Sequence, residues 1–119
     1  MAFIGNEGGP IALATAKRWT VRYRKNEEQS NPGVTVTQAH FFGKEKILEV
    51  LNQEECVGIR IYYGINEDDK REVIVVGAKS DQNNILPSDE NSTDSGSGGI
   101  LLDDSVWCPP FCPDPDDGL

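Results

Sequence analysis

A hairpin of two unlike strands constrains the fold of this chain more than any other stretch. In residues 57–64, apolar residues alternate with polar residues or glycine, which predicts a strand with one apolar face. The return segment, residues 73–76, is β-branched throughout, as expected of a strand covered on both faces. The polar stretch between them is too long for a two-residue turn. The alternating apolar residues are Val57, Ile59, Ile61 and Tyr63.

A long helix is predicted ahead of the hairpin. Residues 11 to about 26 contain no Gly or Pro, and the turn sequence Asn31-Pro32-Gly33 ends the pattern. Trp19 lies on one apolar face, so we expect it to be a buried anchor of the core, packed against the sheet. The residues that share this face are Ala12, Ala16, Trp19 and Tyr23.

Between that helix and the hairpin, the sequence predicts a strand from Val34 to Phe42 and a short helix over 44–52. The connection from Phe42 to Val57 is long enough for a right-handed crossover between parallel strands. The predicted fold class is therefore α+β. We expect a small mixed or antiparallel sheet with a β-hairpin and two helices, followed by an acidic irregular tail.

The charge divides the chain into two parts. Residues 1–79 hold all 11 basic side chains and 11 acidic ones, whereas residues 80–119 hold nine acidic side chains and no basic one, which accounts for the net charge of −9. We therefore expect a head domain over 1–79 and a tail over 80–119, with a flexible linker at Pro87–Gly99. An acidic tail repels phosphate backbones, so no nucleic-acid partner is expected.

Apolar residues reappear after the linker. In water they would cost free energy, which favours a docking arm over a purely solubilising tail. The arm could fold back on its own sheet or dock on a neighbouring copy, and we favour the neighbour because exchanging an arm joins subunits with little new surface. The predicted interaction residues are Ile100, Leu101, Leu102, Val106, Trp107 and Phe111.

The three cysteines and the single histidine are the residues most able to carry chemistry. His40, Cys56, Cys108 and Cys112 together make a tetrahedral zinc set by ligand type, although only Cys108 and Cys112 have a typical ligand spacing. A Cys108–Cys112 disulfide and free, reduced thiols are the alternatives. No other cofactor is expected, and no activated nucleophile or phosphate-binding loop is recognisable, so we do not expect an enzyme.

Three short motifs carry a resemblance. They are Ala39-His40-Phe41-Phe42-Gly43, Gly58-Ile59-Arg60-Ile61-Tyr62-Tyr63-Gly64 and Cys108-Pro109-Pro110-Phe111-Cys112. With a Trp-bearing helix ahead of them, they resemble a family of small uncharacterised bacterial proteins. The resemblance implies that the cysteine-containing end belongs to the protein, and it implies no activity.

These observations favour a non-enzymatic protein-interaction or structural subunit that self-assembles through its C-terminal tail. Its partners would be other proteins or copies of itself. The alternative is a metal-binding or redox-linked protein that uses His40, Cys56, Cys108 and Cys112. Residues 1–10 have no secretory signal pattern, and no run is long enough for a membrane span, so a cytoplasmic location is the default expectation.

Overall fold

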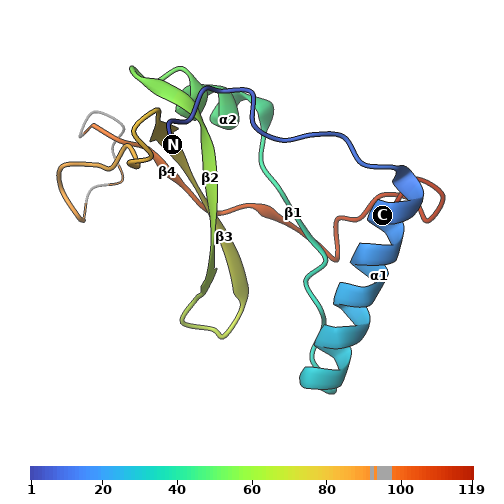
Figure 1. Cartoon of the computed structure of the whole chain (residues 1–119). Coiled ribbons are helices and arrows are strands. Elements are labelled where there is room, and N and C mark those ends of the chain that lie inside the picture. The colour runs from blue at the N-terminus through green and yellow to red at the C-terminus, as the bar shows by residue number, and fades with distance from the viewer. Residues whose placement is uncertain (92, 94–97) are drawn as a thin grey trace. The chain divides into compact units, whose positions relative to one another are not determined.

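The structure is a computed structural model of the whole chain, and it describes residues 1–91, 93 and 98–119. The contacts between residues divide the chain into two compact units (Figure 1). Unit 1 comprises Met1–Glu7 and Phe42–Ser105, and unit 2 comprises Gly8–Phe41 and Val106–Leu119. The elements are α1 (Leu13–Ser30), β1 (Ala39–Phe41), α2 (Lys44–Leu51), β2 (Cys56–Ile65), β3 (Arg71–Lys79), β4 (Leu101–Leu102) and β5 (Val106–Cys108).

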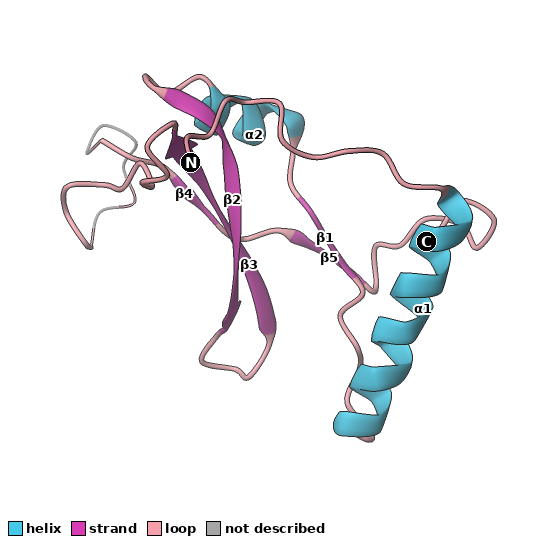
Figure 2. Ribbon diagram, in the orientation of Figure 1, coloured by secondary structure: helices cyan, strands magenta, loops and turns pink. Residues whose placement is uncertain are grey.

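Unit 1 is built on the predicted hairpin, with helix α2 packed against it (Figure 2). Strands β2 and β3 pair antiparallel, with Ile61 opposite Val75, and β4 adds a third strand on the far side of β3. The side chain of Asn66 shapes the turn between β2 and β3, because its Oδ1 accepts hydrogen bonds from the backbone N–H groups of Asp68 and Lys70.

The core of unit 1 lies where α2 meets the central strand. Val50 of α2 is fully buried, as are Val75 and Val76 of β3, whose side chains point to opposite faces of the sheet. Burial on both faces explains why the middle of this strand, residues 73–76, is β-branched throughout. The buried set is small, and it includes Ala78 and the two glycines Gly77 and Gly99.

Unit 2 contains α1 and a two-stranded antiparallel sheet. In this sheet β1 pairs with β5, so that Ala39 lies opposite Cys108, His40 opposite Trp107 and Phe41 opposite Val106. Cys108 is buried, whereas α1 contains no buried residue. The α+β class, the hairpin and the two helices are thus confirmed, and both sheets are antiparallel.

Two expectations about packing are wrong. Trp19 is 57% exposed, so it is not a buried core anchor, because the elements of unit 2 leave its side of α1 open. The strand expected from Val34 forms only over β1, since β5 offers just three partner residues. The strand pairs among the described residues are all antiparallel, which is one of the two arrangements expected, because β1 pairs with the tail instead of joining the hairpin sheet.

The strands of the tail pair within the same chain, and docking of the tail on a neighbouring copy stays a prediction. Strand β4 pairs with β3, and β5 pairs with β1. The predicted linker Pro87–Gly99 includes residues 92 and 94–97, which lie outside the described residues. The boundary between residues 79 and 80 is a boundary of composition, and separate folding of its two sides stays a prediction.

Candidate functional site

The C-terminal cysteines of unit 2 form a disulfide. The Cys108–Cys112 bond joins two residues whose Cα atoms lie 4.8 Å apart, and Cys56 is the remaining free cysteine. Cys108 is 7% exposed because it ends β5 and its carbonyl oxygen accepts a hydrogen bond from the N–H of Gln38. Cys112 lies beyond the strand and is exposed. One cysteine of the disulfide is therefore buried and the other is exposed.

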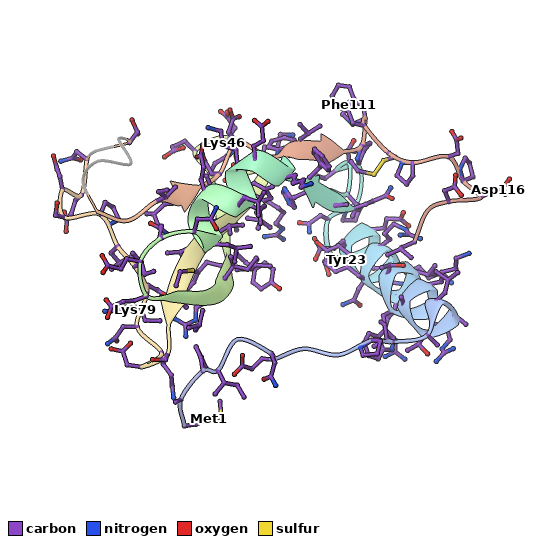
Figure 3. The ribbon with its side chains drawn as sticks, turned by 90° about the horizontal axis from the view of Figure 1, so that it is seen from above. Met1, Tyr23, Lys46, Lys79, Phe111 and Asp116 are labelled. Carbon is purple, nitrogen blue, oxygen red and sulfur yellow. A yellow bond between two sulfur atoms is a disulfide. The ribbon has the colours of Figure 1, made fainter. Side chains whose placement is uncertain are left out.

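The loop between the two cysteines is compact and carries an exposed aromatic ring. The Cys108–Pro109 and Pro109–Pro110 peptide bonds are both cis. The N–H of Phe111 donates to the carbonyl oxygen of Trp107 at 3.1 Å. The ring of Phe111 is 72% exposed, and Figure 3 shows it pointing outward beside the sulfur–sulfur bond.

A cavity of about 560 Å³ in unit 2 adjoins the disulfide. Lys17 and Arg24 of α1 line it together with both cysteines, and Asp114 and Asp117 line it from the segment after Cys112. Nη1 of Arg24 donates a hydrogen bond to the backbone oxygen of Leu119 at 2.9 Å, which ties this segment to the helix. Basic side chains of the helix thus lie near the acidic end of the tail.

The four predicted metal ligands are not brought together within one unit. Cys108 and Cys112 are bonded to each other, and a disulfide offers no thiolate to a metal. His40 lies on β1 in unit 2, whereas Cys56 lies in unit 1, where its thiol donates to the carbonyl oxygen of Gly58 at 3.2 Å. The described residues contain no group of His, Cys, Asp and Glu that could hold a metal ion.

The predicted interaction residues occupy three places. Ile100, Leu101 and Leu102 belong to the segment that adds β4 to the sheet of unit 1. Val106 and Trp107 belong to β5 in unit 2. Phe111 follows them in the loop of the disulfide, and Leu101 and Val106 keep about half of their surface exposed.

A polar cluster on β2 escaped the sequence reasoning in part. Arg60 and Tyr62 share one face of the strand, and Asn84 joins them, accepting a hydrogen bond from Arg60 Nη1 and donating one to the hydroxyl of Tyr62 at 2.8 Å. The hydrogen bond from Asn84 lowers the pKa of Tyr62 below its usual value, and the charge of Arg60 adds to this effect. The Arg60 guanidinium also lies over the ring of Phe3, 5.4 Å from its centre.

The outer side of β2 leaves apolar side chains uncovered. Tyr63 is 87% exposed, and Ile61 and Ile65 of the same strand face are also exposed. Figure 1 shows the loop end of the hairpin extending away from α2. The sequence pattern marked Ile61 and Tyr63 as part of an apolar face and placed Ile65 in the turn, but it could not show that this end of the strand stays uncovered.

Two residues that position the tail gave no signal in the sequence. Gln53 accepts a hydrogen bond from Ile100, and the side chain of Asn84 forms hydrogen bonds with Arg60 and Tyr62 of β2. Both are polar residues in loops, and only their partners, distant in the sequence, make them important. The N-terminal arm carried a weak signal, since Phe3 is an aromatic residue in a glycine-rich stretch.

Compared with known protein families, curated proteins and solved structures, the chain matches none of them. Within the part of the chain that the structure describes, no helix combines the length and the apolar character needed to cross a membrane.

Proposed function

We propose that this chain is a non-enzymatic protein-interaction or structural subunit, whose apolar surface is covered by association with copies of itself. The observation that carries the proposal is the imbalance between its core and its surface. The buried apolar residues are Val50, Val75, Val76, Ala78 and Cys108, whereas large apolar residues are exposed on every helix and on β1, β2, β4 and β5.

Such an imbalance favours association. Water-exposed apolar area costs about 25 cal/mol per Å², and contiguous exposed patches commonly mark protein–protein contacts. The patch on β2 is contiguous, because Ile61, Tyr63 and Ile65 follow one another along one strand face. A subunit that gains part of its stability from a neighbour needs no large core of its own.

The C-terminal tail offers a second route to assembly. Its strands pair with β3 and β1 of the same chain, and the same pairs would form between copies if the tails were exchanged. Exchange would require the segment between residues 87 and 99 to extend toward a neighbour. Tail exchange only re-forms between copies the contacts that exist within one chain, so the exposed apolar face of β2 would stay uncovered.

The native mass of the purified full chain tests the proposal. Light scattering should give a multiple of 13.1 kDa that falls toward a single chain on dilution. A stable monomer that unfolds cooperatively and binds no apolar dye such as anilinonaphthalene sulfonate would contradict the proposal. That result would mean that the apolar residues are covered within one chain.

A redox-linked role is the second candidate, and the Cys108–Cys112 disulfide favours it. The exposed Cys112, which lines the same cavity as the basic residues Lys17 and Arg24, suits attack by an external thiolate. Disulfides persist in oxidising compartments and are rare in the reduced cytoplasm. A cytoplasmic location therefore stays a prediction. The oxidation state of Cys108 and Cys112 in cells would test both the redox-linked role and that location.

A further inference from the structure

We propose that two copies of this chain pair antiparallel through β2, about a two-fold axis that passes through Ile61. The pairing joins the two sheets of unit 1 into one continuous sheet. This inference rests on the proposed function and names the surface and the partner that it would use.

The free edge of β2 is the first reason. In the sheet order β2-β3-β4, one side of β2 pairs with β3 and the other side faces no strand among the described residues of unit 1. Protein edge strands usually discourage pairing by being short or by carrying Lys, Pro or a bulge. β2 is ten residues long and has neither Lys nor Pro, and its register shift lies at its start, between Cys56 and Gly58.

The N-terminal arm covers only the beginning of this strand. Gly5 lies against the carbonyl oxygen of Val57, and Phe3 and Glu7 line a cavity with residues 57–60 and Ala78. The backbone of residues 61–65 is outside this contact, so its outward N–H and C=O groups are available for a new ladder. Because the pairing sets residues 61–65 of one copy against residues 57–61 of the other, the arms of both copies must leave the start of β2 for the full ladder to form.

The sequence of β2 is complementary to itself, which is the second reason. Within residues 57–65, residues at equal distances before and after Ile61 are of similar type. In a second copy that runs antiparallel, each residue on the apolar face of this stretch therefore lies opposite an apolar residue. Arg60 lies opposite Tyr62 of the second copy, where a guanidinium and an aromatic ring attract each other. The other pairs are Ile59 with Tyr63, Gly58 with Gly64, Val57 with Ile65, and Ile61 with itself.

Neighbouring registers are less favourable. A shift that centres the axis on Arg60 places two guanidinium groups opposite each other, which is destabilising. A shift by one residue in the pairing places the apolar face of one copy beside the polar face of the other. A register centred on Tyr62 keeps the faces matched but places Arg60 opposite Gly64, so only the register centred on Ile61 pairs Arg60 with Tyr62 of the second copy.

The area available sets the strength of the contact. The exposed parts of two tyrosines and three isoleucines offer roughly 500 Å² per copy, or about 1,000 Å² in total, if aromatic side chains contribute 150–250 Å² when fully buried. This is the lower limit for a specific interface. The dimer should accordingly form and dissociate with protein concentration.

Cysteine cross-linking tests the pairing. In the full chain carrying Cys56→Ser, Ile61→Cys places two thiols opposite each other at the axis, where Cβ atoms of facing residues lie about 5 Å apart. Ile65→Cys is the matched control: it is an exposed isoleucine on the same face, but its two copies would lie eight residue steps, or roughly 27 Å, apart. Mild oxidation should give a covalent dimer of Ile61→Cys and leave Ile65→Cys as single chains.

The outcomes separate this inference from the proposed function. If Ile61→Cys cross-links no better than Ile65→Cys while the native mass is a multiple of the chain, the β2 pairing is overturned and the proposed assembly stands. If the native mass is that of one chain at every concentration up to roughly 1 mM, both are overturned.

A second variant covers the case in which Ile61→Cys fails to fold. Ile61→Lys places two like charges opposite each other at the axis and should raise the dissociation constant at least about tenfold. Glu67→Lys, in the exposed hairpin turn beyond the pairing, should leave that constant unchanged. Equal dissociation constants for the two variants would overturn the pairing.

Discussion

The Oε1 atom of Gln53 accepts a hydrogen bond from the backbone N–H of Ile100, at 3.0 Å and across 47 residues of sequence. The Nε2 atom of the same side chain donates to the carbonyl oxygen of Val50, also at 3.0 Å. One amide at the end of α2 thus links the helix to the segment that adds β4 to the sheet. The tail is joined to unit 1 through a polar side chain as well as through its apolar residues.

Removing this amide should loosen β4. Both hydrogen bonds of Gln53 are partly buried, and Gln53→Ala leaves the N–H of Ile100 without its acceptor, whereas the carbonyl oxygen of Val50 keeps the backbone N–H of Gln53, so the variant should cost about 1–3 kcal/mol in urea unfolding. Gln29→Ala, on the exposed surface of α1, is the control and should change stability by less than about 0.5 kcal/mol. Equal values for the two variants would show that Gln53 does not hold the tail.

Gly99 should not tolerate a side chain. A Cβ atom there would collide with the carbonyl oxygen of Ile85, so either the backbone must move or the segment must detach. Gly99→Ala should destabilise unit 1 by about 1–3 kcal/mol, as overpacking usually does. Gly9→Ala meets open space and should be close to neutral in the same unfolding measurement. A neutral Gly99→Ala would contradict the docking of this segment.

Exposure of Trp19 predicts a modest effect for its removal. Because this side chain is 57% exposed, Trp19→Ala should cost less than about 1 kcal/mol. Val50→Ala, in the buried core, should cost about 2 kcal/mol or more despite the smaller change in size. The reverse order in denaturant titrations would mean that α1, and not α2, contributes the core.

The sequence predicts the hairpin, the helices and the α+β class because those features depend on local patterns. Alternation along β2 and the β-branched run in β3 are visible within a few residues. The partners of β1 and β4 depend instead on strands more than 20 residues away in the sequence, and they could not be predicted from periodicity. Trp19 shows a different limit, since an apolar stripe indicates a face but not whether another element covers it.

In the candidate site, too, local sequence patterns could be interpreted in advance, whereas contacts between residues distant in the sequence could not. A pairing of Cys108 with Cys112 was one of three open alternatives, because four residues of spacing suit both a disulfide and a metal pair. Gln53 and Asn84 could not be found in advance, because a polar residue in a loop gives no sign of the distant backbone or side chain that it contacts.

Thiol counting tests the disulfide. The native protein, unfolded without reductant, should show one titratable thiol, that of Cys56, and reduction should raise the number to three. Cys112→Ser should cost about 2 kcal/mol, because the bond closes only a short loop and constrains the unfolded chain modestly. Three thiols before reduction would contradict the pairing and would return the cysteines to the free or metal-bound alternatives.

The titration of Tyr62 should depend on Asn84. The hydrogen bond from Asn84 and the charge of Arg60 favour the phenolate, so the pKa of Tyr62 lies below its usual value of 10.0. A lowered pKa in the folded state contributes stability that is present above the unfolded pKa and is lost as the pH falls through the folded one. Absorbance at about 295 nm should show a higher pKa of Tyr62 in Asn84→Ala. Asn83→Ala should leave it unchanged.

Amide hydrogen exchange at two protein concentrations tests the central claim most directly. If copies pair through β2, backbone amides within Ile59–Ile65 should exchange more slowly in the concentrated sample, while the turn at 66–70 exchanges at the same rate in both. The predicted result is protection that grows with concentration and is confined to β2. Identical exchange in β2 at both concentrations, with association still visible in the native mass, would place the interface elsewhere and contradict the account.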